Sequence, residues 1–91
     1  MKNREQDARI CCAQYRVGDL EIEVTLLART QGVGQVYCIL LEQPGERVCC
    51  EVGDALLSAK RLFFDVVYGG VTACTLADVV EDRMAAYSSS A

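Results

Sequence analysis

Apolar and polar residues alternate with a period of two from Ile10 to Leu27, and Gly18-Asp19 interrupts the alternation. Successive side chains of a β-strand point to opposite faces of a sheet, so the pattern predicts two strands that share one apolar face. A Gly-Asp pair suits a two-residue turn, because glycine readily adopts the positive φ that such turns require. We therefore predict an antiparallel hairpin over residues 10–27.

The register of this hairpin follows from pairing Val17 with Leu20 across the turn. This pairing places the apolar residues of both strands on one face and Arg16 opposite Glu21 on the other. The remaining pairs are then Tyr15–Ile22, Ala13–Val24 and Cys11–Leu26 on the apolar face, and Gln14–Glu23, Cys12–Thr25 and Ile10–Leu27 on the other. An apolar face and an opposite-charge pair thus arise from a single register.

A second hairpin is predicted over residues 35–52, around Pro44-Gly45. Pairing Glu42 with Arg47 again gives an apolar face beside an opposite-charge pair. The pairs on the apolar face are Leu41–Val48, Ile39–Cys50 and Tyr37–Val52. A Pro-Gly turn is normally type II, whose twist suits a tight hairpin poorly, so a bulge or a longer loop that shifts this register is the alternative. Residues 30–34 supply the turn between the hairpins.

The second half of the chain has a period of 3.6 residues and predicts two helices. The first covers residues 55–68, with Asp54 as N-cap and Gly69-Gly70 as its end. The second begins with Thr75 as N-cap, has Asp78 as capping-box partner, and fades at Tyr87. Their apolar residues are Leu56, Ala59, Leu62, Phe63, Val66 and Val67 in the first helix, and Leu76, Val79, Val80 and Met84 in the second.

The fold class is therefore α+β: a four-stranded antiparallel β-meander of two hairpins, followed by two C-terminal helices packed on one face of the sheet. The length of 91 residues suits one domain, which we place at residues 8–87. Residues 1–7 and 88–91 are polar and are predicted to be disordered.

Composition and charge exclude several classes of function. The hydrophobic content of 52% argues against global disorder, and the net charge of −4 argues against a nucleic-acid partner. We find neither the apolar core of a signal peptide nor a run long enough to span a membrane. The expected location is the cytoplasm, and no membrane partner is expected.

The chain contains six cysteines and no histidine, which excludes catalytic arrangements with a histidine base. Neighbouring residues of a strand face opposite ways, so Cys11 and Cys50 should point to the helices and Cys12 and Cys49 away from them. The spacings fit neither structural zinc nor a redox Cys-x-x-Cys motif. We interpret the thiols as small packing residues.

Two other interpretations of the cysteines stay open. A thiol-based redox sensor or a thiolate metal-binding protein could use Cys12, Cys38 and Cys49, which could share the outer face of the sheet. Disulfides are the second alternative, although a reducing cytosol disfavours them.

Carboxylates recur in two short segments. Glu21 and Glu23 lie on one strand, and Asp78, Glu81 and Asp82 lie on the second helix. Such groups can bind a hard cation, but acids in a first helical turn also favour the helix dipole, and acids on a strand keep a sheet soluble. We therefore expect no catalytic residue, no cofactor and no metal site.

The outer face of the sheet, away from the helices, is more apolar than a solvated antiparallel sheet needs. Its candidate interface residues are Ile10, Cys12, Leu27, Val36, Cys38, Leu40 and Cys49. Exposed apolar patches often mark interaction sites. We expect a cytosolic protein-interaction or regulatory module without catalytic activity, which forms a homodimer through this face. A tail or helix folded over the face, or a shifted second hairpin, is the alternative explanation.

Two motifs carry a resemblance to a known family. The segment "YCILLE" of residues 37–42 and the segment "GGVTACTLADVVED" of residues 69–82 resemble a family of small clostridial proteins known as a domain of unknown function. Tyr37, Ile39 and Glu42 match its Tyr-Gly-Ile-x-x-Glu strand, with Cys38 in place of the glycine. Residues 71–72, 76 and 78–82 match its helix pair, with Ala73 in place of proline. The resemblance implies a cytosolic bacterial protein and no established activity.

Overall fold

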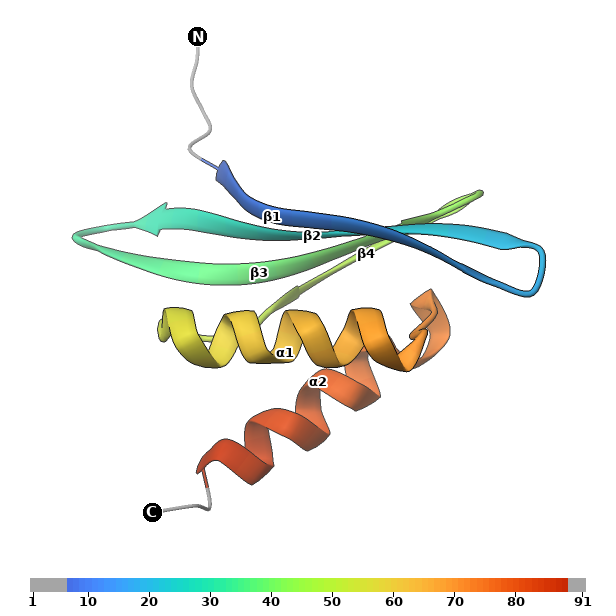
Figure 1. Cartoon of the computed structure of the whole chain (residues 1–91). Helices are drawn as coiled ribbons and strands as arrows, with labels where there is room; N and C mark the ends of the chain where they lie inside the picture. Colours follow the sequence, from blue (N-terminus) through green and yellow to red (C-terminus); the bar gives the residue numbers. More distant parts are fainter. Residues whose placement is uncertain (1–6, 89–91) are drawn as a thin grey trace, which may run out of the picture.

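The structure is a computed structural model that describes residues 7–88. Within this range the chain forms a four-stranded antiparallel sheet of order β1-β2-β3-β4, followed by two helices that contact the sheet (Figure 1). The elements are β1 (Asp7–Val17), β2 (Leu20–Gln31), β3 (Gly34–Gln43), β4 (Glu46–Glu51), α1 (Leu56–Gly69) and α2 (Ala73–Ser88). The predicted α+β meander with two C-terminal helices is confirmed.

The predicted disordered termini, residues 1–7 and 88–91, lie almost entirely outside the described residues. At the boundaries of the described range, Asp7 is the first residue of β1 and Ser88 is the last residue of α2.

The register of the first hairpin is confirmed from Val17–Leu20 to Cys11–Leu26, and corrected beyond that point. A bulge lies between Arg9 and Cys11, so that Arg9, rather than Ile10, pairs with Leu27. A bulge inserts one unpaired residue into a strand and shifts every later pair by one. The prediction of an Ile10–Leu27 pair is therefore wrong.

The second hairpin has the register predicted from its charge pair. Glu42 pairs with Arg47, and Gln43 pairs with Glu46 directly across the Pro44-Gly45 turn. Gly45 adopts a φ of 79°, so a two-residue turn suffices without a longer loop. Leu41–Val48 and Ile39–Cys50 are paired as predicted.

The two hairpins join and end close to the predicted positions. The turn between them consists of Gly32 and Val33, and Gln31 already pairs with Gly34. At the end of β4 the carbonyl of Tyr37 accepts a hydrogen bond from the Val52 N–H at 2.7 Å, and the Tyr37 N–H donates to the Gly53 carbonyl at 2.8 Å. Tyr37 thus bonds to both Val52 and Gly53, so the regular ladder ends at Cys38–Glu51 and the predicted Tyr37–Val52 pair is irregular.

The helix α1 ends as predicted but does not begin as predicted. Ala55, not Asp54, occupies the N-cap position, and no side chain caps this end. The backbone of Ala55 is extended, so the helix starts one residue later than the prediction. At the other end, Gly70 adopts the left-handed conformation, with a φ of 62°, and its N–H bonds to carbonyls of the last helical turn.

The helix α2 begins at Ala73, two residues before the predicted N-cap Thr75. The carbonyl of Thr72 accepts hydrogen bonds from the N–H groups of Thr75 and Leu76, and the Thr75 hydroxyl accepts one from the Thr72 N–H at 3.3 Å. Thr75 therefore lies in the first turn and its side chain reaches back to the N–H of Thr72, as the N3 residue of a capping box does. The sheet also caps this helix, because the Ala73 N–H donates to the Gln43 side-chain oxygen at 3.0 Å.

The core lies between the inner face of the sheet and the two helices, which share one side of it in Figure 1. Its largest fully buried apolar side chains are Ile22, Val24, Leu26, Ile39, Leu41, Val52, Leu62, Val66 and Leu76. Of the predicted helix stripe, Leu56, the first residue of α1, is exposed. The sheet's other face is covered by neither helix of the described chain.

Candidate functional site

The outer face of the sheet is organised in rows that run across the strands. One row consists of Cys12, Thr25, Leu40 and Cys49, and the next contains Arg9, Leu27, Cys38 and Glu51. On one side of these rows Glu23 lies opposite Glu42, and on the other Arg29 lies opposite Val36. Two rows rich in apolar residues and thiols thus lie between two rows that contain charged residues.

Five of the candidate interface residues lie together in these two rows, and a sixth adjoins them. The five are Cys12, Leu27, Cys38, Leu40 and Cys49, and Val36 adjoins them. Ile10 is the unpaired residue of the β1 bulge and is exposed at the edge of the sheet. We call these seven residues the outer patch.

The centre of the outer patch is buried even though neither helix lies over it. Cys38 is 1% exposed and its neighbour Thr25 is 2% exposed. Because successive strands are only about 4.8 Å apart, side chains of one face cover one another. Leu27 and Leu40, which are half-buried, therefore supply more of the contact surface than Cys38.

The thiols of Cys12 and Cys49 lie too far apart to act together. They occupy opposite ends of one row, on the edge strands β1 and β4. Three strand spacings separate them, which corresponds to about 14 Å. Among residues 7–88, no group of three or more His, Cys, Asp or Glu side chains is placed to hold a metal ion.

The environment of Cys12 favours its neutral thiol. The Cys12 Sγ donates a hydrogen bond to a Glu23 carboxylate oxygen at 3.0 Å and accepts one from the Thr25 hydroxyl at 3.6 Å. The hydrogen bond to Glu23 is the largest cause that raises the pKa of Cys12 above its ordinary value of 9.0. Since the thiolate is the reactive form, this arrangement lowers the reactivity of an exposed cysteine.

Burial has the same effect on two other thiols. The pKa of Cys38 is raised chiefly by burial, with a smaller contribution from the nearby Cys49 thiol, and the pKa of Cys50 is raised by burial. As predicted, Cys11 and Cys50 pack against the core on the inner face. Cys74 is exposed on α2, and all six cysteines are unpaired.

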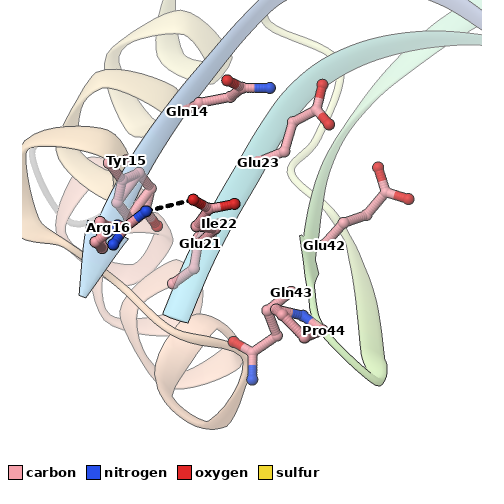
Figure 2. A pocket seen from close by; sticks show the side chains of 9 residues that line it. All are labelled: Gln14, Tyr15, Arg16, Glu21, Ile22, Glu23, Glu42, Gln43 and Pro44. Carbon is pink, nitrogen blue, oxygen red and sulfur yellow. Dashed lines mark hydrogen bonds and ion pairs between the residues drawn. The ribbon is translucent and has the colours of Figure 1, made fainter. Parts of the chain in front are cut away.

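A cleft of about 530 Å³ lies between the tips of the two hairpins (Figure 2). Pairing of β2 with β3 begins only at Glu23 and Glu42, so β2 and the end of β3 diverge beyond this pair. The lining residues are Gln14, Tyr15, Arg16, Glu21, Ile22, Glu23, Glu42, Gln43 and Pro44. Figure 2 shows three carboxylates around this cleft, two of them from the predicted Glu21–Glu23 segment.

Arginines at both edges of the sheet partly neutralise these carboxylates. Arg16 forms an ion pair with Glu21, and Arg47 forms one with Glu42 at 3.1 Å. Glu23 instead accepts the hydrogen bond from the Cys12 thiol. The cleft is thus weakly acidic, and ion pairs and a hydrogen bond within the protein satisfy its carboxylates.

A second exposed apolar surface lies on α1, and sequence reasoning missed it. Leu57 is 81% exposed, Phe64 is 49% exposed and Tyr68 is 84% exposed. Together with Arg61 they recur at intervals of four, three and four residues, which is a helical stripe. The intervals between these residues can be read from the sequence. A helix on a protein surface normally has one apolar side, which faces the core, and sequence analysis assigned that side of α1 to the residues that are buried.

Comparison of the chain with models of protein families, with curated proteins and with solved structures finds no match. The resemblance of residues 37–42 and 69–82 to the clostridial family therefore stays a prediction. No helix among the described residues is long and apolar enough to cross a membrane.

Proposed function

We propose that the protein is a small cytoplasmic protein-interaction module without catalytic activity, which forms a homodimer through the outer patch. The observation that carries the proposal is a sheet face that neither helix of residues 7–88 covers, whose central rows contain Leu27 and Leu40 between rows with charged residues. A solvated antiparallel sheet normally keeps such a face polar. Packing this face against a second copy removes its apolar side chains from water.

The charges on β2 support a second copy as the occupant. Glu23 and Arg29 lie on the outer face on either side of the apolar rows, with Thr25 and Leu27 between them. Consider a two-fold axis that lies in the interface, perpendicular to the strands and between the two apolar rows. Rotation about this axis places Glu23 of each copy opposite Arg29 of the other, which gives two charge pairs in each dimer. The same axis brings Leu40 opposite Cys38, so apolar contacts and charge pairs arise from one arrangement.

The test is native mass spectrometry and sedimentation equilibrium of protein purified without chelator or oxidant. The parent should be a metal-free dimer with the mass of six reduced thiols. Leu40→Lys should be a folded monomer, because a charge would be buried at the centre of the interface. Ala77→Lys, which adds the same charge on an exposed position of α2, should stay dimeric.

Charge reversal tests the arrangement of the dimer. Glu23→Arg and Arg29→Glu should each weaken the dimer, and the double variant should recover part of the loss. A parent that is monomeric at high micromolar concentration, or a Leu40→Lys variant that remains dimeric, would refute the proposal. If Leu40→Lys does not fold, Cys49→Arg at the edge of the patch gives the same test. Bound zinc or iron would instead favour the thiol-based alternative.

A further inference from the structure

The exposed stripe of α1 lies opposite the side of the helix that packs in the core. Leu57, Arg61, Phe64 and Tyr68 form the stripe, which we call the α1 stripe, whereas Ala59, Leu62, Phe63 and Val66 are buried. At 100° per residue the centres of the two sets are about 180° apart. The rings of Phe64 and Tyr68 stack, with centroids 6.1 Å apart, and give the stripe a flat aromatic end. The helix therefore has one apolar side buried in the core and a second apolar side that is exposed.

The spacing of the α1 stripe is that of a coiled-coil seam. Steps of four, three and four residues are those between successive core positions of a heptad repeat. Tyrosine, phenylalanine and arginine are also the residue types enriched at protein interfaces. A single helix from another molecule is thus the shape that this side of α1 accommodates.

The charge beside the stripe is positive. Lys60 flanks the stripe and Arg61 lies within it, and they form the adjacent basic pair of a chain whose net charge is −4. Among the described residues neither has an ion-pair partner. The nearest acid on the helix, Asp65, already pairs with Arg83 of α2 at 3.6 Å. The positive charge on this side of α1 is therefore not balanced within the described chain.

A second copy of α1 leaves Arg61 without an acidic partner in either orientation. In a parallel pair, core positions face their own counterparts, so Arg61 would lie against Arg61 of the second copy. In an antiparallel pair that overlays the two stripes, Arg61 would lie against Phe64 and Lys60 beside Val67, so neither basic residue meets a carboxylate. A helix that carries carboxylates beside its seam supplies the acidic partners that a second copy does not.

We infer that the α1 stripe docks an amphipathic helix of a partner protein, with apolar residues that pack on Leu57, Phe64 and Tyr68 and carboxylates that pair with Lys60 and Arg61. This surface is separate from the outer patch, which lies on the opposite side of the sheet from the helices. Either surface can fail its test without affecting the other.

The experiment uses the full chain and a 15-residue stapled helical peptide labelled with fluorescein. The peptide has leucine at its seam positions and glutamate at the flanking positions, and the control peptide has lysine in place of each glutamate. Fluorescence anisotropy measures affinity, and amide chemical shifts locate the site. The glutamate peptide should bind on the order of tenfold more tightly than the lysine peptide. General attraction to an acidic protein predicts the opposite order.

Variants of the stripe sharpen the result. Arg61→Glu should reverse the preference between the two peptides, and Tyr68→Ala should weaken binding of the glutamate peptide by about fivefold or more. Val33→Ala, which truncates an exposed apolar residue in the β2–β3 turn, should leave binding unchanged. Equal affinity for both peptides, no binding at millimolar peptide, or shifts that map away from α1 would overturn the inference. So would α1 shifts that depend on protein concentration alone, which would identify a second copy as the occupant.

Discussion

The hydroxyl of Tyr15, in β1, donates a hydrogen bond to the main-chain carbonyl of Val71, in the link between the helices. The two residues are separated by 56 positions in the sequence. The Gln43 side chain holds the adjacent start of α2 from β3. Two strands thus fix the position at which the chain turns from one helix to the other, and this position sets how α2 lies under the sheet.

We expect Tyr15→Phe to reduce the free energy of unfolding by about 1 kcal/mol, because a partly buried carbonyl loses its donor while the ring still packs. Urea denaturation followed by circular dichroism measures the loss. Tyr68→Phe is the matched control, since the Tyr68 ring is exposed and should change stability by less than about 0.5 kcal/mol. Equal stability of Tyr15→Phe and the parent would contradict this role for the hydroxyl.

The two glycines at the end of α1 should respond oppositely to alanine. Gly70 has a φ of 62°, which costs a residue with a Cβ about 1 kcal/mol, so Gly70→Ala should destabilise the protein. Gly69 is the last residue of the helix and lacks positive φ, so Gly69→Ala should be neutral or stabilise by up to about 1 kcal/mol. Thermal unfolding of both variants is the measurement. A lower melting temperature for Gly69→Ala than for Gly70→Ala would show that the helix ends differently.

Glu23→Gln should make Cys12 react several-fold faster with iodoacetamide at pH 8. The carboxylate accepts the thiol hydrogen bond and raises the pKa of Cys12, so its removal increases the thiolate fraction. Peptide mass spectrometry follows each cysteine, with Cys74 as the internal reference. The control Glu21→Gln removes a nearby carboxylate that does not contact Cys12 and should leave its rate unchanged. Unaltered labelling of Cys12 in Glu23→Gln would count against the hydrogen bond.

The sequence predicted most of the sheet because two independent features of each hairpin, an apolar face and an opposite-charge pair, indicate the same register. The Arg16–Glu21 and Glu42–Arg47 pairs selected the same registers as the apolar faces, and both registers are present. The sequence does not indicate the bulge at Ile10, because an apolar residue is acceptable on either face of an edge strand. A period of two cannot reveal a single inserted residue.

The helix starts could not be predicted as well, because they depend on the surrounding fold. The sequence predicted Thr75 as the N-cap of α2, but the helix begins at Ala73, where the Gln43 side chain of the sheet accepts a hydrogen bond from the Ala73 N–H. The outer patch followed from alternation, yet the complete burial of Cys38 depends on its neighbours across the strands. The α1 stripe could be predicted only if the side of α1 that packs in the core were already known.

The bulge in β1 also bears on whether the protein forms fibres. An open sheet has two edge strands whose unpaired N–H and C=O groups can recruit strands from other molecules. The bulge at Ile10 interrupts β1, and arginines lie on both sides of it at positions 9 and 16. The other edge, β4, is only six residues long and has charged residues at both ends. Both edges thus have features that oppose strand-by-strand growth into cross-β aggregates.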